Sequence, residues 1–188
     1  LNALAAIAVA LEAGIPFNLI RQALERFEGV QRRFTLRGEV NGVTVIDDYA
    51  HHPAEICATL AAARESYGRR VVAIWQPHRY SRTVALRADF MRAFNDCSLL
   101  LVMDVYPAGE QEVAGLNAET LVRELGHHGH KGAVACPDAA SVLDLAGRRV
   151  RKGDVVITLG AGDVTQISYD LVDLLSTTSP PTLELEGR

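Results

Sequence analysis

The chain has 188 residues, of which 48% are hydrophobic and 22% charged. This composition is typical of a globular protein with a packed core, and the length suits one ordinary domain plus an appendage. The net charge is −4 and no stretch is strongly basic, which argues against nucleic-acid binding because phosphate neutralisation needs clustered Lys and Arg.

The opening stretch "LNALAAIAVALEAG" lacks the basic segment of a signal peptide and is too short to span a bilayer. We therefore expect no membrane partner. The cysteines Cys57, Cys97 and Cys136 are far apart and form no C-x-x-C pair, so they predict reduced thiols in a cytoplasmic protein and neither a disulfide framework nor a zinc site.

Two helices are predicted first. Residues 2–13 are alanine-rich and stop at Gly14, and Pro16 opens a second helix that ends at Gly29. Such a hairpin has one apolar side and no sheet of its own to cover. It resembles the end of a preceding domain.

Strands and helices then alternate. "FTLRGEV" and "VTVIDDY" flank Asn41-Gly42, a strong signal for a two-residue β-hairpin. Further strands are predicted over 71–75, 99–103, 133–136 and 154–159, and helices over 53–67, 81–94, 117–125, 138–147 and 163–175. This alternation predicts an α/β fold: a Rossmann-like, mostly parallel sheet with helices on both faces, preceded by the short helical hairpin. Residues 176–188 have no periodicity and are predicted to be a mobile tail.

Polar residues gather where these strands end. Ligands of open α/β sheets bind beyond the carboxyl ends of the strands, and the four stretches found there are "DDYAHHP", "QPHRYSR", "DVYPAGE" and "GAGD". The glycine pattern "GAG" at 160–162 lacks a third glycine and is weak evidence for a dinucleotide site.

The stretch "QPHRYSR" carries the clearest signal. Ser81 is a plausible N-cap, which places Arg79 before the helix and Arg82 in its first turn, where cations oppose the helix dipole. Two arginines beside free helix N–H groups predict a receptor for a carboxylate or phosphate. The alternative is that both arginines pair with Asp47, Asp48 or Glu55.

In "DDYAHHP", Asp47 is expected to brace the turn and Asp48 to point outward. Pro53 suits the first helical position, with His52 as the cap and Glu55 in the first turn. The tract "HHGH" at 127–130 looks like a metal-binding tract, but it follows a helix end and is interpreted as a solvated turn.

In this order, the motifs resemble the Mur ligases. "LNALAA", "GVQRRF", "VIDDYAHHPAEI", "QPHRYSRT", "DVYPAGE" and "LGAGD" carry the resemblance, which runs from residue 1 to about 175. It is strongest for the branch that joins L-alanine to the carboxylate of UDP-N-acetylmuramate, with ATP and Mg²⁺, through an acyl phosphate. By resemblance, residues 1–33 end a central ATPase domain and residues 34–175 form a C-terminal ligase domain.

The resemblance also implies roles for single residues. Three are expected to bind the nucleotide, and the last two of them to be catalytic: Asn2, Arg33 and Asp48. Five are expected to line the amino-acid and product side: Tyr49, His52, His78, Arg79 and Arg82. No metal ligand is assigned in this chain.

The chain departs from the family pattern in one large respect. It contains no glycine-rich loop ending in Gly-Lys-Ser/Thr and no UDP-sugar domain, so we expect an inactive fragment whose partners include the missing domains. Two alternatives stay open: a related ligase that recycles murein peptide, and a non-catalytic nucleotide-binding or interaction module.

Overall fold

The computed structural model describes residues 2–27 and 29–177, and the chain divides into two compact units, 1–31 and 32–188. The first unit is a hairpin of α1 (Asn2–Glu12) and α2 (Phe17–Glu25). Its helices line an open apolar groove of about 360 Å³, formed by alanine, leucine and isoleucine side chains. Large apolar side chains such as Leu4, Val9 and Phe17 remain exposed.

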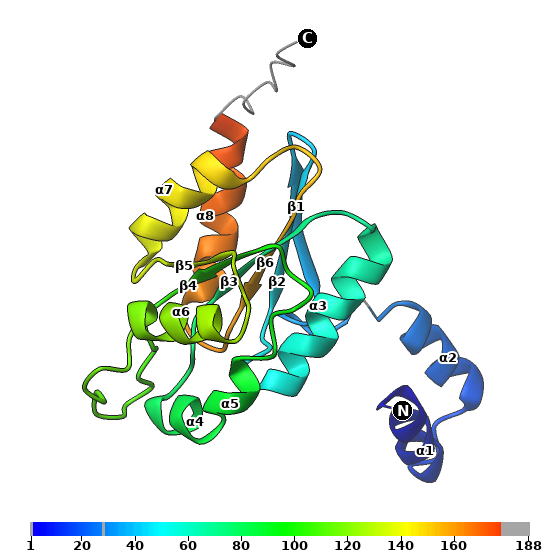
Figure 1. The fold of residues 1–188 in the computed structure, drawn as a ribbon. Coiled ribbons are helices and arrows are strands. Elements are labelled where there is room, and N and C mark those ends of the chain that lie inside the picture. Colours follow the sequence, from blue (N-terminus) through cyan, green and yellow to red (C-terminus); the bar gives the residue numbers. More distant parts are fainter. Residues whose placement is uncertain (1, 28, 178–188) are drawn as a thin grey trace. The chain divides into compact units, whose positions relative to one another are not determined.

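The second unit is built on a six-stranded sheet in the order β1-β2-β6-β3-β4-β5 (Figure 1). Its strands are β1 (Thr35–Val40), β2 (Val43–Asp48), β3 (Val71–Trp75), β4 (Leu99–Val102), β5 (Ala133–Ala135) and β6 (Val155–Leu159). Only the edge strand β1 is antiparallel to its neighbour. The predicted α/β fold is confirmed, and the first hairpin strand lies at the margin of the sheet.

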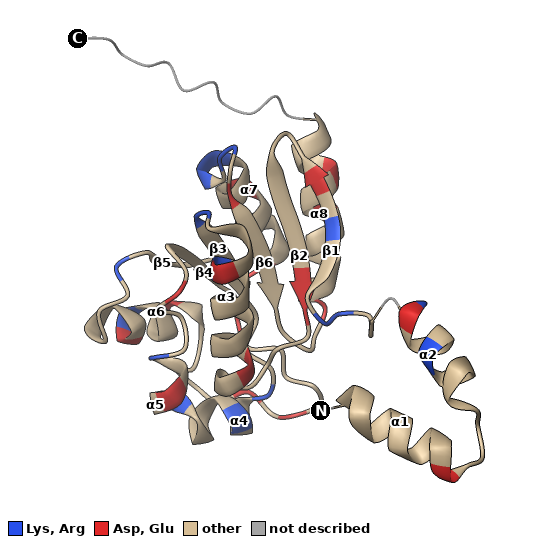
Figure 2. Cartoon of the chain, turned by 90° about the vertical axis from the view of Figure 1, so that its right-hand side faces the viewer, with Lys and Arg blue, Asp and Glu red and all other residues tan. Residues whose placement is uncertain are grey.

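The hairpin between β1 and β2 follows from its turn residues. Asn41 has φ +52° and Gly42 has φ +78°, the left-handed backbone that a two-residue turn requires and that Asn-Gly tolerates best. Val40 then faces Val43 across the turn. The register places Asp47 and Asp48 at the end of β2, the red segment of that strand in Figure 2.

Helices cover both faces of the sheet, and each face has its own core (Figure 1). One layer consists of α3 (Pro53–Tyr67), α4 (Tyr80–Ala85), α5 (Arg87–Phe90) and α6 (Ala118–His127), and the other of α7 (Ala139–Arg149) and α8 (Val164–Thr177). Trp75 is fully buried in the first core, where its ring lies 5.0 Å from that of Phe90 and 4.8 Å from that of Phe94.

The helix predicted over 81–94 is wrong as a single element. Two short helices, α4 and α5, replace it and are separated at Leu86, whose φ of −109° and ψ of 19° are not helical. Contacts from elsewhere fix the second of them: Phe90 packs on Trp75, and the Arg87 guanidinium binds the Glu124 carboxylate of α6 through two nitrogens.

Other boundaries differ by little. Helix α3 has the predicted bounds, with the predicted cap at His52. Helix α8 continues to Thr177, so residues 176 and 177 are helical and not part of the predicted tail. The rest of that prediction, residues 178–188, lies outside the described part of the chain. Cys57, Cys97 and Cys136 are all free thiols, the last two buried. Within residues 2–27 and 29–177, none of the helices has the length and apolar character of a membrane span.

Candidate functional site

The loops after β2 and β3 meet at the carboxyl edge of the sheet, although these strands are not neighbours. Strand β6 lies between them, and its glycine turn brings the two loops close. The Gly160 N–H donates to the Asp48 carbonyl at 3.2 Å, and the Gln76 N–H donates to the Leu159 carbonyl at 3.0 Å. The loops after β2 and β3 therefore meet across a third strand, β6.

A row of four aromatic rings joins these loops. We call Tyr49, His51, His78 and Tyr106 the ring row. Ring centroids are 5.2 Å apart between Tyr49 and His51, 6.1 Å between His51 and His78, and 5.4 Å between His78 and Tyr106, whose rings are stacked. Tyr106 reaches the row because the loop after β4 pairs with the loop after β3 through a β-bridge at His78.

Both aspartates of β2 are buried, which differs from the prediction for Asp48. Asp48 does not point outward: it is 5% exposed and accepts hydrogen bonds from the backbone N–H groups of Phe34 and Ala50, both at 2.7 Å. It therefore braces the turn and fixes the chain just after Arg33. Burial raises the pKa of the Asp48 carboxyl above its usual value, although both backbone donors oppose the shift.

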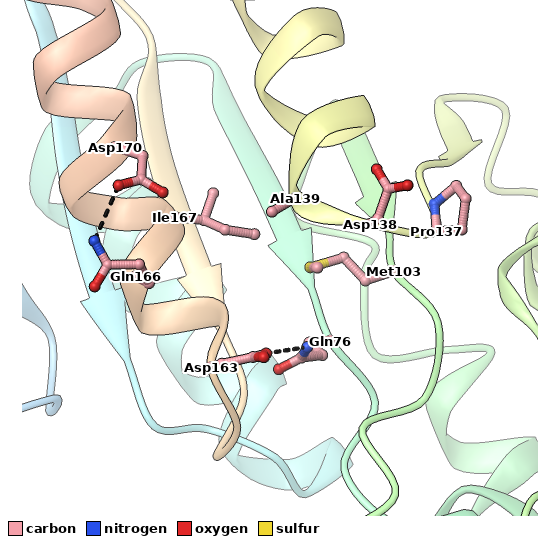
Figure 3. Close-up of a pocket in the computed structure, with 9 residues that line it drawn as sticks. All are labelled: Gln76, Met103, Pro137, Asp138, Ala139, Asp163, Gln166, Ile167 and Asp170. Carbon is pink, nitrogen blue, oxygen red and sulfur yellow. Dashed lines mark hydrogen bonds between the residues drawn. The ribbon is translucent and has the colours of Figure 1, made fainter.

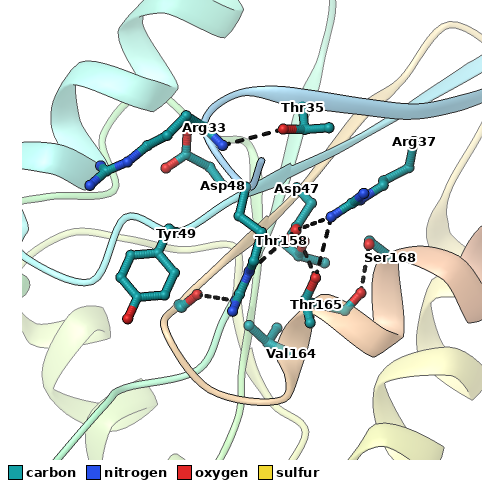
Figure 4. A network of polar contacts seen from close by, with 12 residues as sticks. Arg33, Thr35, Arg37, Asp47, Asp48, Tyr49, Thr158, Val164, Thr165 and Ser168 are labelled. Atoms are coloured by element: carbon teal, nitrogen blue, oxygen red, sulfur yellow. Dashed lines mark hydrogen bonds and ion pairs between the residues drawn. The ribbon is translucent and has the colours of Figure 1, made fainter. Parts of the chain in front are cut away.

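Asp47 lies on the other side of β2, at the centre of a buried polar network (Figure 4). Its carboxylate accepts hydrogen bonds from the Thr158 and Thr165 hydroxyls and from the Arg37 guanidinium, each at 2.7 Å. The Arg32 Nε lies 3.5 Å from the same carboxylate. The network connects β1, β2, β6 and α8 directly beneath the candidate site.

The neighbouring histidines have different partners. The His52 ring accepts from the Ala54 N–H at 3.3 Å as the N-cap of α3, and Glu55 completes a capping box. His51 enters the ring row, and its Nδ1 lies 2.9 Å from the Tyr49 carbonyl. Sequence reasoning selected His52 and missed His51. Two adjacent histidines on a turn point in different directions, and nothing local indicates which one faces the site.

Arg32 and Arg33 follow α2, and Arg33 is the more accessible of the two. Its side chain is 52% exposed, with Nη1 3.7 Å from a Glu55 carboxylate oxygen and its guanidinium 5.8 Å from the centre of the Tyr49 ring. An arginine with free donors beside an ionised partner can bind a phosphate or carboxylate in addition. Asn2 belongs to the first unit, and its predicted role stays a prediction.

The predicted helix-end receptor at residues 79–82 is not open. Helix α4 begins one residue earlier than expected, with Arg79 as the cap at φ +72°. Both the N–H and the hydroxyl of Ser81 donate to the Glu110 carboxylate, which also lies 3.9 Å from the Arg79 guanidinium. The Ser81 donors hold the pKa of Glu110 below its usual value. A carboxylate of the chain itself therefore occupies this helix end, and the arginines do not pair with Asp47, Asp48 or Glu55.

Arg82 points to the ring row. Its Nη1 donates to the His78 carbonyl at 3.2 Å and lies 3.4 Å from the His78 ring nitrogen Nδ1. Burial and then the charge of Arg82 lower the pKa of His78 from its usual 6.5, so the imidazole is neutral at pH 7. His51 thus links the Tyr49 ring to the His78 ring, and His78 in turn contacts Arg82.

A cavity of about 430 Å³ lies at the same edge of the sheet, on the side of α7 and α8 (Figure 3). Met103 and Ile167 contribute apolar surface, and Asp138, Asp163 and Asp170 contribute carboxylates. Acidic walls do not suit a phosphate, and the residues predicted for the site are absent from its lining. We therefore place the candidate site at the ring row.

The glycine turn of β6 is shaped by protein contacts. A Cβ at Gly162 would lie 2.5 Å from the Gln76 side-chain oxygen and 2.8 Å from the Tyr106 ring. Gln76 also accepts from the Val164 N–H and donates to Asp163. The "GAG" pattern therefore reflects close packing under the ring row, and no dinucleotide role is needed to explain it.

Gly162→Ala is expected to destabilise the second unit by about 1–3 kcal/mol, as overpacking of a filled site does. The measurement is urea unfolding followed by the fluorescence of Trp75, the only tryptophan in the chain. The matched control is Gly147→Ala in α7, where a Cβ meets only Leu174 at 3.6 Å. That variant is expected to be neutral or stabilised by up to about 1 kcal/mol. Equal midpoints for the two variants would contradict the packing role of Gly162.

The "HHGH" tract lies apart from the site. His127 ends α6, the His128 ring contacts the Glu124 carbonyl at 3.0 Å, and His130 lies 3.5 Å from the Cys97 sulfur. Across the described residues, no three His, Cys, Asp or Glu side chains are grouped closely enough to hold a metal ion.

Comparison with known proteins identifies the second unit. Residues 32–162 match the family model described as "Mur ligase, glutamate ligase domain". UDP-N-acetylmuramate–L-alanine ligases from Anaeromyxobacter dehalogenans and Myxococcus xanthus are 53% and 49% identical to the chain, over 93% and 94% of its length. In each case the chain spans 38% of the relative.

Two solved structures extend the comparison. The UDP-N-acetylmuramate–alanine ligase of Thermotoga maritima matches with a TM-score of 0.73 and 30% identity, over 92% of this chain and 36% of that one. The murein peptide ligase of Psychrobacter arcticus matches with a TM-score of 0.70 and 25% identity, over 94% of this chain and 36% of that one.

Proposed function

Since this chain belongs to the Mur ligase family, we propose that it is the C-terminal part of an ATP-dependent ligase that joins L-alanine to UDP-N-acetylmuramate in peptidoglycan precursor synthesis. The relatives that are about half identical carry this name. In this reaction ATP phosphorylates the substrate carboxylate, and the amine of L-alanine attacks the acyl phosphate and releases phosphate. The proposed location is the cytoplasm, where ATP and the nucleotide sugar are available.

The observation that carries the proposal is the ring row with its arginines at the carboxyl edge of the sheet. Arg82 is proposed to offer guanidinium donors for the carboxylate of the amino acid, and Tyr49, His51 and His78 form the wall beside it. Arg79 is half exposed beside Glu110 and is proposed to line the same side without being the main donor. The lowered pKa of His78 favours its neutral form at pH 7, so the carboxylate would be held by guanidinium charge and not by an imidazolium. Positioning of this kind supplies much of the rate enhancement in acyl and phosphoryl transfer.

Arg33 and Asp48 receive separate roles. Arg33 is accessible and is proposed to contact the ATP phosphate, with Glu55 holding its side chain in place. Asp48 is proposed to act by fixing the turn after Arg33, because both of its oxygens accept backbone hydrogen bonds. Mg²⁺ would offset the phosphate charge. We assign it no ligand among the described residues, since no group of three potential ligands occurs there.

The first unit is proposed to belong to the preceding ATPase domain. Its exposed apolar side chains include Leu4, Val9 and Phe17, which the hairpin itself does not cover. Exposed apolar surface of this extent in a small unit indicates packing against another part of the protein. The UDP-sugar and ATPase domains of the complete protein are therefore the proposed partners of this chain.

The test is a ligation assay with the complete protein. ATP, UDP-N-acetylmuramate and L-alanine should yield UDP-N-acetylmuramoyl-L-alanine, detected by mass, together with phosphate. The 188-residue chain alone should give no product above an Arg33→Ala control. Turnover with a murein tripeptide in place of L-alanine would instead indicate the recycling ligase. Failure with both substrates would favour a non-catalytic module.

A further inference from the structure

Arg32 and Arg33 are adjacent in sequence but differ in their surroundings. The Arg33 side chain is 52% exposed, whereas that of Arg32 is 23% exposed. The Arg32 guanidinium donates to the Gly160 carbonyl at 2.7 Å and to the Gly162 carbonyl at 3.2 Å. It therefore holds the glycine turn that lies between the loops after β2 and β3 and links them.

The same guanidinium also contacts the first ring of the ring row. Its central carbon lies 4.9 Å from the centre of the Tyr49 ring, within the range of a cation–π contact. Its Nε lies 3.5 Å from the buried Asp47 carboxylate. The Arg32 backbone adds another link, since its carbonyl accepts from the Tyr49 N–H at 2.7 Å.

These contacts use the planar shape of the group. One face meets an aromatic ring while the edge donates to two carbonyls, and a compact ammonium group has no flat face that would let it reproduce this geometry. The backbone of Arg32 has φ +58°, an unfavourable region for a residue with a side chain. This conformation is held in place by the surrounding hydrogen bonds, and it directs Arg32 and Arg33 to different partners.

We propose that Arg32 is a positioning residue for the reaction: it holds the Tyr49 ring and the glycine turn in the arrangement that binds the amino acid. The inference rests on the proposed function, in which Tyr49 lines the amino-acid side. Arg32 itself contacts no substrate in this account. It acts through Tyr49.

Arg37 provides a matched control. It donates to the same Asp47 oxygen at 2.7 Å and its side chain is 13% exposed, so its removal leaves the same buried carboxylate with one fewer partner. Its guanidinium lies 4.5 Å from the Tyr169 ring in α8 and not over the ring row. Arg32 and Arg37 thus share a structural role but differ in the tyrosine they contact.

The first experiment uses the complete ligase with varied L-alanine. Arg32→Ala is expected to lower kcat/KM for L-alanine by up to about 10²-fold, the cost of misplacing a binding group by roughly 1 Å. The loss should lie mainly in KM for L-alanine, and Arg32→Lys should recover part of it. Arg37→Ala is expected to keep the wild-type kinetic constants even if its melting temperature falls. Equal kinetic losses for Arg32→Ala and Arg37→Ala would overturn the inference.

The second experiment needs no activity. The chain has 5 tyrosines, so after labelling with 3-fluorotyrosine the Tyr49 signal in the ¹⁹F spectrum can be assigned with Tyr49→Phe. Arg32→Ala should shift the Tyr49 signal and leave that of Tyr169 in place, and Arg37→Ala should do the reverse. An unmoved Tyr49 signal in Arg32→Ala overturns the inference. An inactive wild-type ligase overturns the proposed function instead, and the spectrum still decides whether Arg32 positions Tyr49.

Discussion

Replacing Asp47 with alanine is expected to destabilise the second unit by about 3–5 kcal/mol, the usual cost of breaking a buried ion pair from one side. Asp47 is fully buried. Two hydroxyls and one guanidinium donate to its carboxylate, and a second guanidinium lies within 3.5 Å. Without it, the positive charges of Arg32 and Arg37 would lose their common counter-charge in a largely buried region.

The Asp47→Asn variant removes the negative charge of the side chain but keeps its volume, so the two contributions to stability can be measured separately. The amide keeps the size of the side chain and can still accept from Thr158, but it cannot balance the Arg37 and Arg32 charges. We therefore expect Asp47→Asn to be clearly destabilised as well, though less than Asp47→Ala because it leaves no cavity. Wild-type stability of the asparagine variant would show that the ion pairs contribute little.

The measurement is urea unfolding monitored by Trp75 fluorescence, since this single tryptophan is fully buried in the second unit. The matched control is Asp144→Ala in α7. Asp144 forms an ion pair with Arg148 one helical turn away, and both side chains are about two-thirds exposed. Its removal is expected to cost no more than about 0.5 kcal/mol. A midpoint for Asp47→Ala as close to the wild type as that of Asp144→Ala would contradict the prediction.

Local patterns predicted the fold because local chemistry determines most of it. The Asn41-Gly42 turn sets the hairpin, and Pro53, His52 and Glu55 together start α3. Buried strands such as Val71–Trp75 are continuous apolar runs. These features act within a few residues of one another, so the sequence shows them directly.

The predictions fail where contacts with residues distant in the sequence determine the local structure. Residues 80–95 contain no Gly or Pro to end a helix, and the break at Leu86 is stabilised by contacts with Trp75 and Glu124. The Glu110 carboxylate, which comes from another loop, accepts the Ser81 N–H at the start of α4, and no pattern around Ser81 indicates this contact. The orientation of Asp48 depends on the Phe34 N–H, which the chain brings near by pairing β1 with β2. Contacts of this kind become visible only in the folded chain.

The candidate site shows the same division. The polar residues at the strand ends predicted that side chains distant in sequence meet at the carboxyl edge of the sheet. Tyr49, His78 and Arg82 do gather there. Tyr106 and Arg32 were missed because each reaches the ring row through a backbone pairing, with His78 and with Tyr49 respectively.

Arg82→Ala is expected to lower kcat/KM for L-alanine in the complete ligase by roughly one to two orders of magnitude. The reason is the loss of a charge-assisted hydrogen bond to the carboxylate of the amino acid, worth about 1.5–3 kcal/mol. Arg82→Lys should recover only part of the activity, because an ammonium group cannot reproduce the planar fork. The control is Arg148→Ala, which removes an exposed arginine from α7 and should leave the kinetics unchanged.

Stability should change little. The variant loses the hydrogen bond from the partly exposed Arg82 side chain to the His78 carbonyl. Helix α4 has only six residues, so Arg82 lies in both its first and its last turn and the effect of the helix dipole is small. A net change within about 0.5 kcal/mol is expected at pH 8. A variant that melts several degrees lower and keeps wild-type kinetics would show that Arg82 is structural.

The pKa of His78 gives a further readout for Arg82→Ala. Burial is the main reason that this pKa is low, and the Arg82 charge is the second, so the variant should raise the His78 pKa toward 6.5 without fully restoring it. A histidine with a lowered pKa binds its proton more weakly in the folded state than in the unfolded state. Its cost to stability is therefore absent well above pH 6.5 and grows as the pH falls through 6.5 toward the folded pKa. Between pH 8 and pH 6 the wild type should lose more stability from this group than Arg82→Ala does. An NMR titration of His78 that gives the same pKa in both proteins would separate Arg82 from the ring row, and its proposed contact with the amino-acid carboxylate would then lose its structural basis.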